Sequence, residues 1–283
     1  MKTILLPVED HESITAVFET ARLIAQRFDS CIEGFAVYPE PRDFVTVDPL
    51  SNLTVPHSDE REVEIETRAR GLFETFMQAK GVPRVSPPPK GQQQATYSHC
   101  WLRARAESDA FIGSYGRLFD LIVLGRPGRA LEHPRMPPLE AALFESGHPV
   151  LIAPPAPPRS LGHKVLVAWN GSTEQARTVA FAMPLLRQSE QVTVLSVEGG
   201  MTPGPAGEDV ALHLCMNGVA AVAITVSPGT RTTGEAILEH ARSLGCDLLV
   251  KGAYTQSRLR QMMFGGATRH ILAHATLPVL MAH

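Results

Sequence analysis

The chain has 283 residues, 44% of them hydrophobic, and a formal net charge of -3. At roughly 150 residues per domain, this length predicts two domains with a sizeable core. The charge excludes the broad basic surface of a nucleic-acid binder. No apolar run approaches the roughly 20 residues of a membrane span, and the opening MKTILLPVED turns acidic too early for a signal peptide. We therefore expect a cytoplasmic protein that binds neither nucleic acid nor a membrane.

The first half opens with TILLPVEDHESITAVFETARLIAQRF, a short apolar run, a polar turn and then apolar residues at helical spacing. An additional segment rich in proline and turn formers, PEPRDFVTVDPLSNLTVPHS, follows before a helix predicted at 59–79. The half closes on FDLIVLGRPG and GHPVLIAPP, whose apolar runs are typical of buried strands. These elements alternate strand and helix.

The segment PPAPPRSLG, residues 154–162, has the proline density of a stiff linker and divides the chain. The second half repeats the order of the first, because KVLVAWNGSTEQARTVAFAMPLLRQ opens it and CDLLVKGAYT and LPVLMAH close it. We predict a first domain at 1–153 and a second at 163–283.

In the second half we predict strands at 164–169, 191–197, 220–226, 247–252 and 278–282, with helices between them. Continuous Val, Leu and Ile runs are typical of strands whose two faces are both covered, as in a parallel sheet. The fold class predicted for the chain is α/β, with two tandem doubly wound domains that each hold a five-stranded parallel sheet.

The closing stretch KGAYTQSRLRQMMFGGATRHILAHATLPVLMAH predicts an anion site. Gly252 ends a strand, and Gly265, Gly266 and Ala267 open the helix that contains Thr268. Glycine lets a backbone approach a ligand closely, and the free N–H groups of a first helical turn favour phosphate.

A second loop is expected to face this one. In a doubly wound sheet, ligands bind beyond the carboxyl ends of the strands where neighbouring connections diverge. If the strands that end at Trp169 and Gly252 are neighbours, Asn170 would reach a ribose or base. Ser172 fits better as the N-cap of the following helix than as a ligand contact.

On these motifs the chain resembles the universal stress protein family in its tandem form. The family's nucleotide motif is Gly, two residues, Gly, nine residues, Gly and a small residue. Here Gly252, Gly265 and Gly266 fit three of these places, and Thr255 replaces the second glycine. Asn170 stands where ATP-binding members have an aspartate.

The resemblance implies a fold of the adenine nucleotide alpha hydrolase type and a stress-response sensor or regulator that binds ATP, ADP or AMP, with Mg²⁺ as an accompanying ion. Its implied binding residues are Trp169, Asn170, Gly252, Thr255, Gly265, Gly266, Ala267 and Thr268. No catalytic residue is indicated, so hydrolysis of ATP would be slow at most. The alternative is a nucleotide-free scaffold whose halves form an intrachain pseudo-dimer, with an unknown protein partner or a second copy.

The first half departs further from the motif. Gly125 and Gly128 keep the initial spacing, but Met136, Pro137 and Pro138 stand where the paired glycines would lie. Proline removes the N–H donors that a phosphate needs. We therefore expect a first domain whose nucleotide loop is degenerate and whose role is structural.

Cysteine and histidine spacing gives weaker signals. The four cysteines are scattered and form no CxxC pair: Cys31, Cys100, Cys215 and Cys246. We expect reduced, mostly buried thiols rather than a zinc knuckle or a disulfide framework. His270 and His274 lie four residues apart on a predicted helix, but without an HExxH pattern or a carboxylate partner they favour a partly exposed helix face over a metal site.

Overall fold

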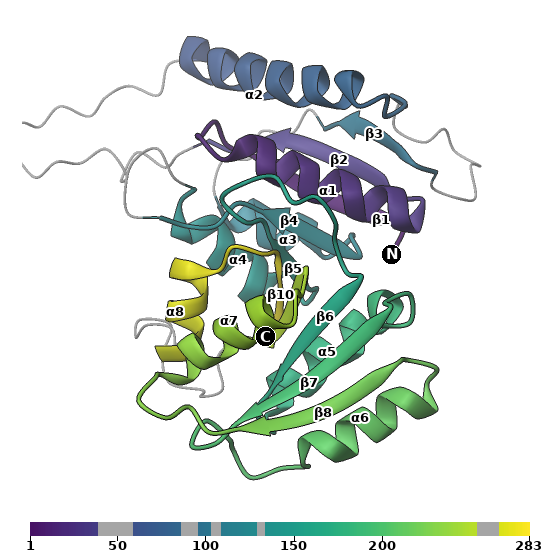
Figure 1. Cartoon of the computed structure of the whole chain (residues 1–283). Coiled ribbons are helices and arrows are strands. Elements are labelled where there is room, and N and C mark those ends of the chain that lie inside the picture. Colours follow the sequence, from purple (N-terminus) through teal and green to yellow (C-terminus); the bar gives the residue numbers. More distant parts are fainter. Residues whose placement is uncertain (39–58, 86–95, 103–108, 129–133, 254–265) are drawn as a thin grey trace, which may run out of the picture.

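The computed structural model describes residues 1–38, 59–85, 96–102, 109–128, 134–253 and 266–283. Within these residues the chain forms a ten-stranded sheet with helices on both faces (Figure 1). Thr255 and Gly265 of the predicted nucleotide motif lie outside the described residues.

The two halves of the sheet have the same strand order. The first half runs β3-β2-β1-β4-β5 and the second runs β8-β7-β6-β9-β10. The strands of the first half are β1 (Thr3–Val8), β2 (Cys31–Ala36), β3 (Ser98–Trp101), β4 (Leu121–Leu124) and β5 (Val150–Ile152). Those of the second are β6 (Lys164–Trp169), β7 (Gln191–Val197), β8 (Ala221–Val226), β9 (Leu248–Gly252) and β10 (Val279–Ala282). The predicted α/β class and the five parallel strands of each half are confirmed, and the two sets of strands form one ten-stranded sheet.

The halves join through the last strand of each. β5 and β10 pair antiparallel, with Leu280 opposite Leu151, while every other pairing of named strands is parallel in the described residues. Both leucines are fully buried, so the hydrophobic core runs through the joint without a break. Figure 1 shows the first half above this joint and the second half below it.

Helices cover both faces because the crossover connections reverse direction within each half. The first half contains α1 (Ile14–Phe28), α2 (Asp59–Ala79), α3 (Ala110–Gly116) and α4 (Met136–Glu145). The second contains α5 (Thr173–Leu186), α6 (Gly207–Met216), α7 (Thr233–Ser243) and α8 (Gly266–His274). α1 contacts α2, α3 packs on α4 and α7 packs on α8, while α5 lies over β9 and β10.

The proline-rich segment at 154–162 is fastened to both halves. The guanidinium of Arg27, in α1, donates to the carbonyl oxygen of Leu161 at 2.7 Å and to the side chain of Gln188 at 3.1 Å. Leu161 itself is 3% exposed. Arg126 of the first half also donates to the carbonyl oxygen of Ala275. Leu161 and Gly162 at the end of the segment are thus buried at the junction of the halves, whereas Pro155, Ala156, Pro157 and Arg159 are exposed.

The predicted element bounds agree closely with the structure. β6 and β7 have the predicted ends, and β8, β9 and β10 each begin one residue later than expected. The helix predicted at 59–79 is α2. None of the helices in the described parts of the chain is both long and apolar enough to cross a bilayer.

Candidate functional site

The candidate site lies at the carboxyl ends of β6 and β9, which are neighbours in the sheet. Val165 is paired with Leu248 and Val167 with Val250, both in parallel register. The chain leaves β6 toward β7 and leaves β9 toward β10, on opposite sides, and this divergence opens the crevice where doubly wound folds bind ligands.

The turn after β6 is held by a second loop. The carbonyl oxygen of Asn170 accepts hydrogen bonds from the backbone N–H of Thr202 at 2.8 Å and from its hydroxyl at 3.0 Å. Gly171 has φ 81°, and a Cβ there would lie 2.6 Å from the carbonyl oxygen of Thr202. Only glycine satisfies both conditions, so the turn is fixed by its backbone.

One of the two polar atoms of the Asn170 side chain is hydrogen-bonded within this turn. Its Oδ1 accepts a hydrogen bond from the backbone N–H of Ser172 at 3.2 Å. Within the described part of the chain, no acceptor binds Nδ2, which remains available to a ligand. Ser172 is the N-cap of α5, since its hydroxyl accepts from the N–H of Gln175 at 3.2 Å. The N-cap interpretation of Ser172 is therefore confirmed.

Gly252 has a packing role that its motif does not reveal. A Cβ at this position would lie 2.6 Å from the backbone nitrogen of Gln175, so β9 can approach the first turn of α5 only with glycine here. The side chain of Gln175 is 1% exposed; its Oε1 accepts from the N–H of Gly252, and its Nε2 donates to the carbonyl oxygen of Val250 at 3.4 Å. Gln175 thus ties the first turn of α5 to the end of β9.

Lys251 is a further residue of the site that the sequence motifs did not mark. Its side chain is 6% exposed, and its Nζ donates to the carbonyl oxygen of Gly252 at 3.2 Å. In the described residues no carboxylate pairs with it. Burial lowers the pKa of Lys251 to about 8, because the apolar surroundings disfavour the ammonium form.

The position of Lys251 follows from strand alternation. Gly252 faces α5, so the side chain of Lys251 points to the opposite face of β9, on the side of α7 and α8. A buried lysine without a carboxylate is costly to the fold, and the strand context LLVKG would have revealed it as an unusual charge in an apolar run.

The first turn of α8 also lies at this edge, because α8 carries the chain from the end of β9 back to the start of the parallel strand β10. Gly266 is exposed, and a Cβ there would meet no atom of the described residues within 4 Å. Ala267 contacts the first turn of α7 at Gly234, and Thr268 is 4% exposed. Packing therefore accounts for Ala267 and Thr268 but not for glycine at Gly266.

Trp169 lies at the end of β6, but its ring packs between α5 and α6. The ring is 5% exposed, and Nε1 donates to the carbonyl oxygen of Pro205 at 2.8 Å. It lines a groove between α5 and α6 together with Val179 and Val210. The indole therefore packs against helices on the face away from Lys251.

The matching place in the first half is filled by protein atoms. At the ends of β1 and β4, Arg135 donates to Glu9 at 2.7 Å and binds Asp109 through two hydrogen bonds of 2.8 and 3.1 Å. A Cβ on Gly125 would lie 2.4 Å from Pro134. The cavity left among these residues is about 10 Å³. Burial raises the pKa of Glu9, although Arg135 opposes this effect.

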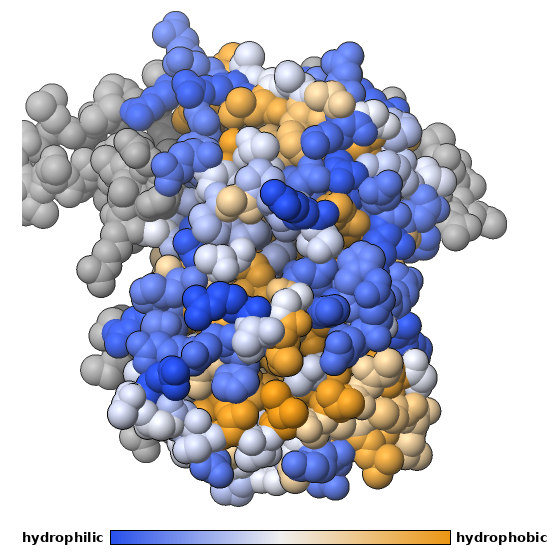
Figure 2. Space-filling view, viewed as in Figure 1, coloured by the Kyte–Doolittle hydropathy of each residue, from blue (hydrophilic) through white to orange (hydrophobic). Residues whose placement is uncertain are grey.

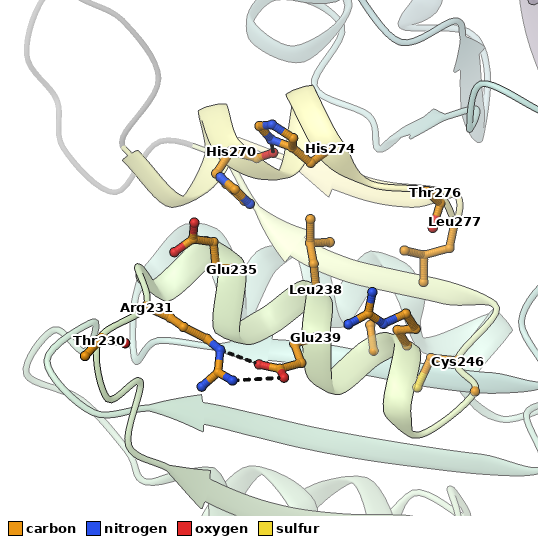
Figure 3. A pocket seen from close by; sticks show the side chains of 13 residues that line it. Thr230, Arg231, Glu235, Leu238, Glu239, Cys246, His270, His274, Thr276 and Leu277 are labelled. Carbon is orange, nitrogen blue, oxygen red and sulfur yellow. Dashed lines mark hydrogen bonds and ion pairs between the residues drawn. The ribbon is translucent and has the colours of Figure 1, made fainter.

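A separate groove of about 820 Å³ lies between α7 and α8 (Figure 3). The Arg231–Glu239 ion pair lines it, and His270 stacks on His274 with ring centroids 4.2 Å apart. Nδ1 of His274 lies 2.9 Å from the carbonyl oxygen of His270. The described residues contain no group of three metal-ligating side chains. This groove runs along the surfaces of α7 and α8, and Glu235 and His270 line it near the first turns of these helices.

Comparisons with known proteins agree with this architecture. Residues 218–283 match the model of the universal stress protein family. The chain is 36% identical over 47 residues to the stress response protein NhaX of Bacillus subtilis (strain 168), a match that covers 17% of this chain and 28% of that protein. The chain therefore aligns with less than a third of this curated relative.

Solved structures resemble the chain over its whole length. A universal stress protein from Archaeoglobus fulgidus DSM 4304 is 17% identical, with a TM-score of 0.68 and coverage of 99% of this chain and 97% of that one. A protein of unknown function from Pseudomonas aeruginosa PAO1 is 14% identical, with a TM-score of 0.56 and coverage of 100% and 92%. Residues 218–283 thus belong to the universal stress protein family, and the whole chain has the fold of a solved universal stress protein.

Proposed function

We propose that the chain is a stress-response sensor or regulator that binds one adenine nucleotide, ATP, ADP or AMP, at the carboxyl ends of β6 and β9. The observation that carries the proposal is Lys251, a buried cation with no carboxylate partner among the described residues, next to the strand end at Gly252. An anionic ligand at this edge would compensate its charge.

Three groups would divide the work of binding. Lys251 would supply positive charge, the N–H groups at the start of α8 would bind phosphate oxygens, and Nδ2 of Asn170 would donate to the ribose or the base. Among the described residues nothing fills the space of a Cβ at Gly266, which supports a phosphate bound close to the backbone there. When Mg²⁺ accompanies the nucleotide, it would neutralise further phosphate charge.

Charge placed at the start of α8 tests this proposal. Gly266→Asp adds a carboxylate where the protein has open space, and a carboxylate in a first helical turn stabilises a helix by about 0.3–1 kcal/mol. We therefore expect unchanged or slightly higher stability, but affinity for ADP lowered by roughly tenfold or more, since 1.4 kcal/mol of repulsion corresponds to a factor of ten.

The matched control is Ala206→Asp, which makes the same charge change at the exposed N-cap of α6. Titration calorimetry with ADP should give this variant the affinity of the unsubstituted chain. If Gly266→Asp binds ADP as tightly as the control, the site is placed wrongly. If the unsubstituted chain binds none of the three nucleotides, the scaffold function takes its place.

A further inference from the structure

Two cysteines far apart in the sequence meet on the α3 side of the first half. Cys31 begins β2 and Cys100 lies in β3, and their Sγ atoms are 4.0 Å apart. In the parallel register Cys31 is opposite Ser98 and Cys100 is opposite Glu33, so all four side chains lie on one face of the sheet. The intervening residues face α2, where a Cβ on Gly34 would contact Phe73.

We propose that Cys31 and Cys100 form a peroxide-reactive dithiol, in which Cys31 attacks hydrogen peroxide and Cys100 then closes a disulfide with it. This site is independent of the nucleotide proposal, since it lies in the other half of the chain.

Exposure separates the roles of the two thiols. Cys31 is half-buried, whereas Cys100 is 3% exposed. The hydrogen bond with Cys100 lowers the pKa of Cys31 to about 7, and the same contact raises the pKa of Cys100. Cys31 is therefore the thiol that solvent reaches and that carries thiolate near neutral pH, and thiolate is the nucleophilic form.

Glu33 lies where a proton acceptor is needed. Its Oε2 is 3.8 Å from Sγ of Cys100, and its Oε1 accepts a hydrogen bond from the hydroxyl of Tyr115 at 2.7 Å. Tyr115 belongs to α3 and thereby fixes the carboxylate beside the buried thiol. Glu33 can take the proton of Cys100 as that thiol becomes a nucleophile.

The reaction balances in two steps. In the first, the Cys31 thiolate attacks one peroxide oxygen, a sulfur–oxygen bond forms, the O–O bond breaks, and the departing hydroxide takes a proton to become water. In the second, Cys100 gives its proton to Glu33 and attacks the sulfur of the Cys31 sulfenic acid. The sulfur–sulfur bond forms, the sulfur–oxygen bond breaks, and the leaving hydroxide takes the proton from Glu33 to become the second water, which restores the carboxylate. Two thiols are oxidised and one peroxide is reduced.

The position of β3 lets the sulfurs close from 4.0 Å to the bonded distance of about 2.05 Å. β3 is the outermost strand of the sheet, four residues long, and β2 is its neighbour on one side. On its other side the described residues make an isolated bridge between Arg84 and His99. Among the named strands of the described residues β3 pairs with β2 alone, so a small shift of β3 changes no other strand pairing, while its buried Trp101 stays packed on Phe73 of α2.

Oxidation of a variant that keeps only this pair tests the proposal. Cys215→Ser with Cys246→Ser removes the other two thiols. With hydrogen peroxide we expect loss of both remaining thiols to maleimide, a Cys31–Cys100 cross-link in peptide mass spectrometry and full reversal by dithiothreitol. If both thiols persist at peroxide concentrations that oxidise the exposed Cys215 of the unsubstituted chain, or if they cross-link only between molecules, the proposal is wrong.

Single substitutions assign the roles within the pair. Cys100→Ser should trap Cys31 as a sulfenic acid that dimedone captures, whereas Cys31→Ser should leave Cys100 unreactive. Glu33→Gln keeps an acceptor for Tyr115 but removes the base, so we expect disulfide closure to slow by roughly tenfold or more while Cys31 still reacts with peroxide. Equal closure rates in Glu33→Gln and its parent would remove Glu33 from the mechanism.

Discussion

At the scale of single residues, glycine stands at two positions of the nucleotide motif for different physical reasons. Gly252 is required because the backbone of α5 occupies the space of its Cβ, whereas a Cβ at Gly266 would meet open space. The sequence marks both as candidate ligand contacts but cannot separate them, since the partner of Gly252 is Gln175, 77 residues away in the chain. The same distance hid the role of Gln175, whereas Lys251 could have been found as a charge inside the apolar strand LLVKG.

Gly252→Ala should therefore destabilise the fold with or without a ligand. The added Cβ would lie 2.6 Å from the backbone nitrogen of Gln175, and overpacking of this kind costs about 1–3 kcal/mol. Urea denaturation should show this loss, while Gly266→Ala, with open space around its Cβ, should match or exceed the stability of the parent. Equal stability of the two variants would show that β9 does not need the close approach.

Lys251→Met tests the cost of the buried cation. The folded pKa of Lys251, about 8, lies below its ordinary value of 10.5, so the unfolded chain binds the proton more tightly between these values. The loss of folding stability caused by the buried ammonium is therefore complete below pH 8 and disappears as the pH rises through 10.5. The difference between the two pKa values corresponds to about 3 kcal/mol of unfolding free energy.

We expect Lys251→Met to be more stable than the parent by up to this amount at pH 7, with the gap closing by pH 10.5. Urea denaturation at several pH values measures it. The same variant should bind ADP more weakly. A variant that is less stable at pH 7 would mean that the lysine contributes to folding and is not held there at a cost.

At the scale of elements, strands with long apolar runs were predictable and short polar ones were not. The sequence located β6 and β7 to the residue because six or seven consecutive residues carry the signal. β3 has the sequence SHCW and α3 has seven residues, and neither is long enough to show a period. The contact between Cys31 and Cys100 depends on β3, so the spacing of the cysteines in the sequence did not reveal it. The expectation of mostly buried thiols was wrong, because Cys100 alone among the four is fully buried.

The ion-pair cluster between the ends of β1 and β4 gives a prediction at this scale. Arg135→Met would leave Glu9 and Asp109 close together and largely buried, and removing one partner of a buried pair costs about 3–5 kcal/mol. Chemical denaturation should show this loss. Arg231→Met, which removes an exposed arginine from its pair with Glu239, is the control and should cost about 0–1 kcal/mol. If both variants lost only a similar small amount of unfolding free energy, the ion-pair cluster would not be what stabilises this edge of the first half.

At the scale of the whole molecule, the tandem repeat was readable from the sequence, but the joint between the halves was not. Both halves close on short apolar strands, and pattern alone does not say that β5 and β10 pair with each other antiparallel. Figure 2 shows apolar surface at the lower right, over the region of α6 and β8, where Leu212, Met216 and Val222 are exposed. The two halves thus form one continuous sheet, and apolar side chains are exposed at its β8 end.

Although the halves share one strand order, they differ at the strand ends where a nucleotide would bind. In the described residues the β6–β9 edge offers a buried cation without a carboxylate partner and a Gly266 whose Cβ would contact nothing, whereas the β1–β4 edge is filled by Pro134, Arg135 and their partners. Bound nucleotide should therefore occupy the second half alone.

Native mass spectrometry of the intact chain in saturating ADP tests this claim most directly, because it counts ligands on each molecule. We expect one nucleotide per chain at saturation and, at an ADP concentration near the Kd of the unsubstituted chain, a clearly lower occupancy in Gly266→Asp but not in Ala206→Asp. Two nucleotides per chain, or one that survives Gly266→Asp unchanged, would contradict it.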